Sequence, residues 1–194
     1  MKMFKQWKKR WAGFSLVEIV IAIAVIGIMS AASVPLIKST LDKSKNSRAK
    51  SELEEIRNAS VSFYGDTFQV PGNIGCTKTA TTHLLTDTAA AKIDMSKAGT
   101  VTSDDLDAHF NTNCTGANAG KYTDNSLGGA WRGPYMEADR YDPWQKSYVL
   151  VTNTFGTTDT ASGYALSGGT DEQVNTAKAT AASTSDVYIK VSLK

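Results

Sequence analysis

A single carboxylate interrupts the longest apolar stretch of this chain. Between Phe14 and Ile37 the sequence contains one ionisable side chain, Glu18. Moving a lone carboxylate into hydrocarbon costs on the order of 2.5 kcal/mol or more. A charge in such a place is a functional hypothesis by default, and we expect Glu18 to need a cationic partner.

Few other side chains are spaced for chemistry. The two histidines, His83 and His109, are too few and too scattered to indicate a metal site. The sequence contains no Gly-x-Ser-x-Gly, His-Glu-x-x-His or Walker motif and no glycine-rich nucleotide-binding pattern. These absences argue against a membrane-anchored enzyme, and a structural role is favoured.

The element that carries Glu18 is long enough to cross a bilayer. A helix from Phe14 to Ile37 spans about 36 Å at 1.5 Å per residue. The positive-inside rule places its basic N-terminal side in the cytoplasm, where Trp7 and Trp11 suit the membrane interface. We therefore expect a single membrane pass with the rest of the chain outside the cytoplasm.

The formal net charge of +2 conceals an asymmetry along the chain. Residues 1–13 contain five cations and no acid, so the remaining chain is net acidic. The basic character belongs to the leader, which argues against nucleic-acid binding by the body. The five cations are Lys2, Lys5, Lys8, Lys9 and Arg10.

Beyond the membrane segment, residues 38–64 predict an amphipathic continuation of the same helix. Pro35 should kink the helix or loosen one turn, because it lacks a backbone donor and crowds the preceding turn. The expected buried face covers a globular domain, as amphipathic helices usually do. Its residues recur at helical spacing and are Leu41, Ala49, Leu53, Ile56, Ser60 and Phe63.

Residues 65–194 predict a globular head. The glycine and proline of 64–73 end the long helix, and 76–126 predict a long connection with one short helix capped by Ser103. Within 147–194, three stretches alternate or are bounded by turn residues, which is typical of strands: 147–153, 162–168 and 186–193. The expected fold class is α+β, a long helix packed on an antiparallel sheet of about three strands.

The only cysteines of the sequence, Cys76 and Cys114, lie in this head. An exported domain meets oxidising conditions, so a disulfide between them is favoured. The alternative is two buried free thiols. On the chain-entropy model, closing a loop of this size stabilises by roughly 3 to 4 kcal/mol.

The N-terminal region offers two cleavage sites. SAAS at 30–33 weakly imitates the small residues that end a secretory signal directly before its cleavage site, whereas a second junction lies between Gly13 and Phe14. Around that junction the chain resembles type IV prepilins and the pseudopilins of type II secretion. It shares the glycine before the cut, the aromatic first mature residue, glutamate at the fifth mature position (Glu18) and proline at the twenty-second (Pro35).

The resemblance implies a processing route, a partner and a location. A prepilin peptidase would cleave after Gly13, and the new amine of Phe14 would be methylated. The subunits would then leave the inner membrane through an assembly platform and polymerise through their apolar helices, together with minor pilins or pseudopilins. In that core Glu18 would pair with the Phe14 amine of a neighbouring copy, offsetting the cost of both buried charges.

A second resemblance concerns residues 128–151. Trp131, Gly133-Pro134-Tyr135, Asp142-Pro143-Trp144 and Tyr148 are similar to a loop of major pseudopilins, with Gln145 where that family usually has glycine. The pilin fold and the function of a major pseudopilin are therefore expected. The longer region 76–126 and the cysteine pair look more like the major subunit of a type IV pilus, and a tip-located minor pilin is a further alternative that Glu18 disfavours.

Major pseudopilins also bind calcium in the loop before the last strand. Here that loop offers oxygen atoms in Ser167, Asp171, Glu172 and Asp186, of which Ser167, Asp171 and Asp186 are the expected ligands, although the denser acidic run of the family is missing. A calcium ion held by these three residues is the only cofactor expected, and the alternative is a solvated loop.

Overall fold

The computed structural model describes residues 13–72, 76, 81–86, 102–114, 119–123, 128–138, 140–152, 155, 162–171, 173–174 and 186–193. The chain divides into two compact units, residues 1–43 and 44–194. The first contains the apolar part of the long helix, and the second contains the remainder of that helix and the head.

Helix α1, Leu16–Thr67, is continuous through Pro35. The predicted helix therefore forms with nearly the expected bounds. Its buried residues are Ala49, Leu53, Ile56, Ala59, Ser60, Phe63 and Thr67. This is the expected stripe with one correction: Leu41 is 57% exposed, so burial starts at Ala49 rather than at Leu41.

The head contains a five-stranded sheet of order β2-β1-β3-β4-β5. Its strands are β1 (His83–Leu85), β2 (Ser103–Asp105), β3 (Val149–Val151), β4 (Ser162–Ser167) and β5 (Val187–Ser192). Strands β1, β3, β4 and β5 pair antiparallel in that order, whereas β2 pairs parallel to β1. The expectation of about three strands was too low, because β1 and β2 come from the region predicted as a connection.

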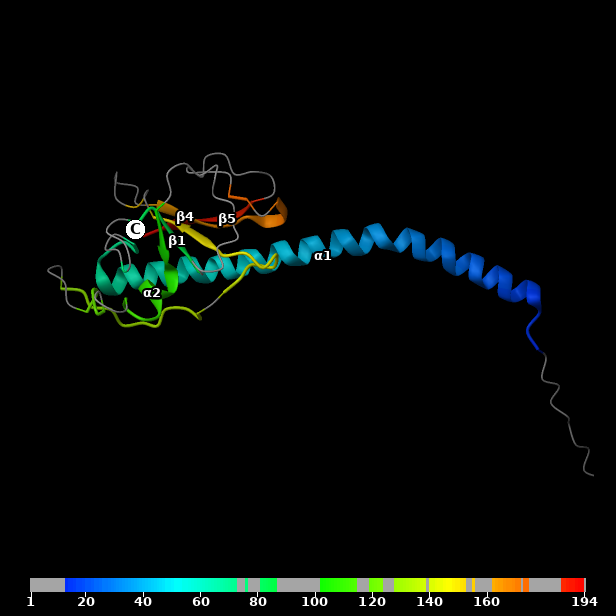
Figure 1. Cartoon of the computed structure of the whole chain (residues 1–194), viewed down its shortest axis with the longest axis horizontal. Helices are drawn as coiled ribbons and strands as arrows, with labels where there is room; N and C mark the ends of the chain where they lie inside the picture. The colour runs from blue at the N-terminus through cyan, green and yellow to red at the C-terminus, as the bar shows by residue number, and fades with distance from the viewer. Residues whose placement is uncertain are drawn as a thin grey trace, which may run out of the picture. The chain divides into compact units, whose positions relative to one another are not determined.

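Strand β5 has the predicted alternation. Val187 and Val191 are buried, whereas Tyr188, Lys190 and Ser192 are exposed. All three residues of β3 are buried, so at that strand both faces of the sheet are covered. Figure 1 shows the sheet lying along the part of α1 that belongs to the head.

The main core lies between α1 and one face of the sheet. It includes Leu53, Ile56 and Phe63 from the helix and Leu84, Leu150 and Ala165 from the strands. A second cluster of Leu85, Val149, Val151, Leu166 and Val174 covers the opposite face. Burying one of the larger side chains of these clusters stabilises the fold by about 1.5 to 3 kcal/mol.

A short helix, α2 (Leu106–Phe110), follows β2 directly. Its cap is Asp105, whose side chain accepts a hydrogen bond from the Asp107 amide, so the assignment of the cap to Ser103 was wrong. The reason is the strand: Ser103 pairs with His83 of β1, and the chain stays extended until Asp105. Helix α2 also brings Phe110 and His109 into the core.

Candidate functional site

The first candidate site is the exposed apolar part of α1. Its large side chains are 46% to 80% exposed between Phe14 and Ile37. By length and composition this helix could cross a membrane. An apolar surface of this length is unfavourable in water, so it needs a bilayer or other protein to cover it.

The predicted processing residues lie at the start of this surface. Gly13, Phe14 and Ser15 precede the helix, and Phe14 is 78% exposed. Glu18 lies in the first turn of α1, where the N-terminal end of a helix favours negative charge. Gly13-Phe14 is therefore an exposed junction directly before the apolar helix, with an exposed carboxylate one turn beyond.

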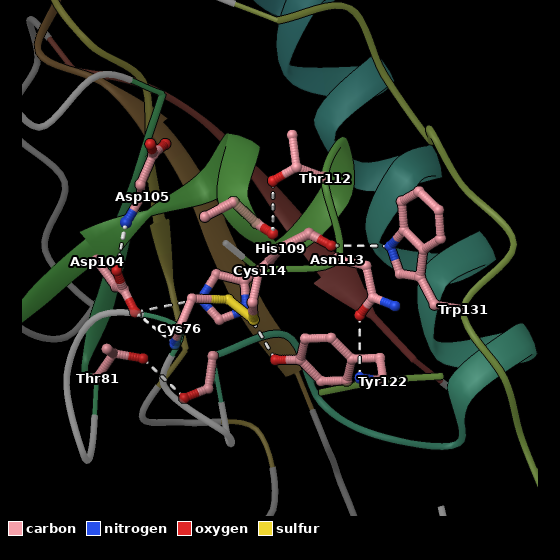
Figure 2. The surroundings of a disulfide bond; sticks show 12 residues. Cys76, Thr81, Asp104, Asp105, His109, Thr112, Asn113, Cys114, Tyr122 and Trp131 are labelled. Atoms are coloured by element: carbon pink, nitrogen blue, oxygen red, sulfur yellow. Dashed lines mark hydrogen bonds and ion pairs between the residues drawn. A yellow bond between two sulfur atoms is a disulfide. The ribbon is translucent and has the colours of Figure 1, made fainter. Parts of the chain in front are cut away.

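The second candidate site surrounds the disulfide. The structure joins Cys76 to Cys114 with an S–S distance of 2.00 Å, which confirms the predicted bond (Figure 2). Both cysteines are almost completely buried. Cys114 follows α2, so the bond ties this helix to the segment beyond the end of α1.

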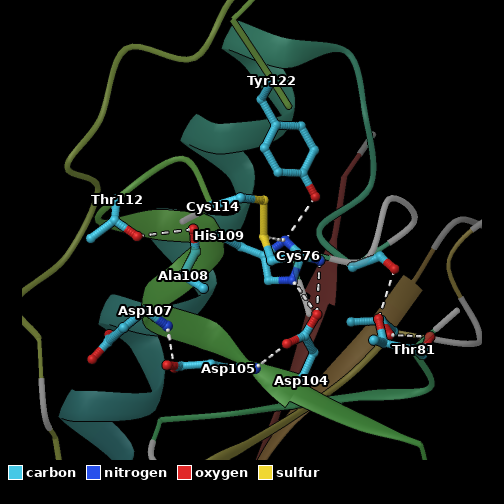
Figure 3. A network of polar contacts seen from close by, with 12 residues as sticks. Cys76, Thr81, Asp104, Asp105, Asp107, Ala108, His109, Thr112, Cys114 and Tyr122 are labelled. Carbon is cyan, nitrogen blue, oxygen red and sulfur yellow. Dashed lines mark hydrogen bonds and ion pairs between the residues drawn. A yellow bond between two sulfur atoms is a disulfide. The ribbon is translucent and has the colours of Figure 1, made fainter. Parts of the chain in front are cut away.

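A buried polar network faces this bond, as Figure 3 shows. His109 Nδ1 lies 3.3 Å from Cys76 Sγ and 2.7 Å from the Tyr122 hydroxyl. On the other side of the ring, Nε2 lies 3.4 Å from Asp104 Oδ2, which also accepts the Cys76 amide at 2.9 Å. Burial raises the pKa of Tyr122, so this hydroxyl stays protonated.

The sequence does not predict these site residues: the two histidines are too scattered to indicate a metal site, and no motif includes Asp104 or Tyr122. The proximity of Asp104 and His109 is local, since both lie around the start of α2. Their approach to Cys76 is not local and depends on the pairing of β2 with β1. The sequence places a cysteine, a histidine and an acid in one polar region. The spacing of these residues, however, does not predict that they contact one another.

The loop of aromatic residues packs the head against α1. Trp131 donates from Nε1 to the His109 carbonyl at 3.0 Å, and the Tyr135 hydroxyl donates to Asp66 Oδ2 at 3.0 Å. Burial and the Asp66 carboxylate raise the pKa of Tyr135 to about 12. These hydrogen bonds hold the aromatic side chains of the loop against α2 and the last turns of α1.

Asp142 organises the second half of the loop. Its Oδ1 accepts the amides of Trp144 and Lys146, and its Oδ2 accepts the Ser167 hydroxyl at 2.6 Å. Burial raises the pKa of Asp142, although these hydrogen bonds oppose that shift. Gln145 closes this turn at φ 63°, in the left-handed region that favours glycine.

Replacing Gln145 with glycine is expected to stabilise the head by about 0.5 to 1 kcal/mol. The left-handed conformation costs a residue with a Cβ about 1 to 2 kcal/mol, part of which glycine returns through its freedom in the unfolded chain. Gln145 is exposed, so little packing is lost. Denaturant unfolding of the full chain in detergent, followed by near-UV circular dichroism, measures the effect. Gln145→Ala keeps the Cβ and should give no gain; equal midpoints for both variants would contradict the explanation.

An open groove lies between α1 and this loop. Its lining includes Arg48, Glu52, Glu55, Glu137 and Arg140. Each arginine pairs with a glutamate of the same groove: Arg48 with Glu52 at 2.7 Å, and Arg140 with Glu55 and Glu137. Glu52 also accepts the buried hydroxyl of Tyr148. The Arg140–Glu55 pair joins the loop to α1, whereas Arg48–Glu52 lies within the helix and Arg140–Glu137 within the loop.

The predicted calcium ligands are only partly described. The Ser167 hydroxyl is buried and donates to Asp142, while it accepts the Gly169 amide at 3.2 Å. Asp171 ends the short helix η2 (Gly169–Asp171), and its side chain lies outside the described residues. Asp186 is half-buried directly before β5. The calcium site therefore stays a prediction.

If these residues bind calcium, chelation should lower the melting temperature of the head. The stabilisation by bound calcium grows with its concentration and reaches about 2.7 kcal/mol at a hundredfold excess over the dissociation constant. Thermal unfolding of the full chain in detergent, with calcium and with chelator, is the measurement. Superimposable curves would leave 168–186 as an ordinary solvated connection.

Comparison with known proteins places the strongest similarity at the N-terminus. Residues 9–34 match the family model described as the prokaryotic N-terminal methylation motif. Searches of curated proteins and of solved structures gave no match. The matched segment includes Gly13, Phe14 and Glu18. It supports a type IV pilin-like subunit and implies processing by a prepilin peptidase, and together with the apolar helix it is consistent with anchoring in the inner membrane.

Proposed function

We propose that this chain is the bulk structural subunit of a type IV pilin-like filament and, within that class, the major pseudopilin of a type II protein secretion system. The observation that carries the filament role is the exposed apolar surface of α1 with Glu18 in its first turn. A bilayer covers such a surface before assembly, and copies of the same helix cover it afterwards.

Assembly would depend on two charges that meet in the filament core. Cleavage after Gly13 converts Phe14 into an N-terminal residue whose amine is cationic at neutral pH, and methylation keeps that charge. In a dry core, this cation and the Glu18 carboxylate of a neighbour are each costly alone and much less so as a hydrogen-bonded pair. The pair also sets the axial position of each new subunit.

The loop of residues 128–148 supports the pseudopilin role. The positive φ of Gln145 is the backbone conformation that suits the glycine of major pseudopilins, so the chain departs from that pattern in residue type while keeping a compatible turn. The disulfide and the long region 76–126 favour the alternative, a major pilus subunit in adhesion, motility or DNA uptake. Both alternatives use the same filament core and differ in the machine that builds the filament.

The purified mature protein is expected to start at Phe14 with a methylated amine. The reason is the position of the junction: it directly precedes the apolar helix, on the basic, cytoplasmic side where the prepilin peptidase acts. Intact-mass measurement of purified filaments tests this. A mature chain that retains Lys8 to Arg10, or one that starts near Ser33, would remove the basis of the proposal.

Complementation separates the two filament types. The gene would be expressed in one host that lacks its major pseudopilin and in another that lacks its major pilin. Restored release of secreted enzymes in the first, with no surface pili in the second, is the expected result. Pili and twitching motility in the second host without secretion in the first would assign the chain to a type IV pilus.

A further inference from the structure

The disulfide and His109 bring together two sulfur atoms and an imidazole nitrogen that would suit a thiophilic metal once the cysteines are reduced. One ligand atom from each of Cys76, His109 and Cys114 lies within 4.8 Å of the others. All three side chains are buried. Two thiolates and an imidazole nitrogen are a ligand set that zinc-class cations bind in proteins.

The hydrogen bonds orient His109 as a ligand. The Tyr122 oxygen interacts with the Gly72 backbone amide, so its own proton is available for His109 Nδ1 at 2.7 Å. With Nδ1 as the acceptor, the ring proton is assigned to Nε2, which lies 3.4 Å from Asp104 Oδ2 and makes no hydrogen bond with any described residue in the oxidised state. The unprotonated nitrogen therefore faces the sulfur atoms, and the protonated nitrogen faces a carboxylate.

This arrangement resembles the way in which the histidine ligands of zinc sites are oriented by the groups around them. A ligating histidine commonly donates its other ring proton to a carboxylate, which fixes the tautomer and the ring orientation. Asp104 is held in place independently, since it accepts the amides of Cys76 and Asp105 at 2.9 Å each. Asp104 is thus a positioning residue for His109.

We propose that Cys76, Cys114 and His109 bind one zinc-class divalent cation whenever the two cysteines are reduced, and release it when the disulfide forms. The two thiolates and Nδ1 would be the protein ligands. On metal binding, the Tyr122 hydroxyl would give up its hydrogen bond to Nδ1, and the Nδ1 lone pair would bind the metal instead. That hydroxyl or a water molecule would take the fourth tetrahedral position. The state that binds the metal is the one the chain has before oxidation during export, or after reduction by a dithiol.

The two states interconvert by balanced steps. A dithiol reductant transfers two electrons and two protons to the disulfide and itself becomes a disulfide; the cation then displaces two protons from the thiols. In the reverse direction a disulfide oxidant accepts two electrons from the two thiolates and two protons from water and becomes a dithiol, the bond between Cys76 and Cys114 forms, and the cation leaves. The metal would hold the two sulfurs together until oxidation replaces it.

Nucleophilic catalysis by the same residues fits the geometry less well. Cys76, His109 and Asp104 are spaced as a nucleophile, base and orienting acid would be. However, Cys76 is 3% exposed and His109 is completely buried, so the described part of the folded head has no surface on which a substrate could be held beside the sulfur, whereas reduction or oxidation of the bond needs only a transient local opening. A single cation is small enough for such a site, and it neutralises both thiolates there.

The test uses the full chain in detergent, reduced without denaturant by a phosphine and titrated with Co²⁺. Tetrahedral thiolate coordination should produce intense visible absorption and sulfur-to-cobalt charge-transfer bands, saturating at one ion per chain. Zn²⁺ should displace the cobalt, and oxidation by a disulfide should release the zinc to a chromogenic chelator. The oxidised chain should give no such spectrum.

Three variants make the site falsifiable. His109→Gln keeps both thiols and should weaken cobalt binding by at least about tenfold, and Asp104→Asn should weaken it by roughly 10- to 100-fold. His83→Gln removes the other histidine of the chain and should bind like the parent. Equal affinity for the parent and His109→Gln would overturn the proposal, because two thiols alone would then account for binding.

A separate measurement detects whether the head loses its fold when the disulfide is reduced. Near-UV circular dichroism of the reduced chain reports the packing of Tyr122 and Trp131 around the site. A signal that is kept, or that zinc restores, supports the proposal. A reduced chain that loses this signal and does not regain it with zinc would overturn it, even if the thiols still bind metal.

Discussion

Replacing Glu18 with valine is expected to abolish filament assembly while leaving membrane insertion intact or improved. The apolar helix becomes more apolar, so its transfer into the bilayer is no less favourable. In the filament, however, the Phe14 amine of a neighbour loses its counter-charge, and an unpaired buried charge is strongly destabilising. We expect the amount of filament to fall by roughly a hundredfold or more.

Sheared filaments and the membrane fraction, quantified from the same cells by electron microscopy and immunoblotting, provide the measurement. Glu18→Asp keeps the charge on a shorter side chain and should assemble partially. Ser33→Ala removes a hydroxyl that donates to the Met29 carbonyl of its own helix at 2.8 Å, so it serves as a control that should assemble normally. Normal filaments with Glu18→Val would sink the pairing of Glu18 with the amine.

Local periodicity predicted the parts of the fold that depend on neighbouring residues. The stripe from Ala49 to Phe63 on α1 repeats at helical spacing, and the alternation in β5 places Val187 and Val191 on one face. In both elements the burial of each residue follows from its place in the repeat. The unusual position of Glu18 could be predicted for the same reason, because the apolar residues around it are its neighbours in the sequence.

The missed strands show where such reasoning fails. Strand β2 has the sequence Ser-Asp-Asp, which disfavours a strand and resembles a helix cap. Tertiary contacts override that preference: β2 pairs with β1, and Asp104 is buried against the Cys76 amide and His109. Three-residue strands also carry too little pattern to be recognised by alternation.

The network around the disulfide was partly predictable. The bond between Cys76 and Cys114 followed from composition and compartment, because only one pairing of two cysteines exists. The position of His109 beside it depends on three segments that meet only in the folded head: Cys76, α2 and the residues around Tyr122. The spacing of these residues in the sequence does not predict that the three segments contact one another.

Phe63→Ala is expected to destabilise the head by about 3 to 5 kcal/mol, the usual cost of removing a buried phenylalanine ring. Phe63 is completely buried on α1 and contacts aromatic rings from three other segments. The ring centroids lie 4.8 Å from Tyr122, 5.4 Å from Phe110 and 5.6 Å from Tyr135. Removing this ring leaves a cavity and also ends the edge-to-face contacts with Tyr122 and Tyr135, each worth about 0.5 to 1.5 kcal/mol.

The free energy of unfolding of the full chain in detergent, followed by near-UV circular dichroism in denaturant, measures this loss. Val61→Ala is the matched control: it shortens a side chain two residues away on the same helix, but Val61 is 41% exposed. Its expected effect is within about 0.5 kcal/mol, as for other surface substitutions. If Phe63→Ala cost no more than Val61→Ala, the head would not depend on α1 for its core. The long helix would then have to be regarded as a separate stalk, stabilised only by the membrane or the filament.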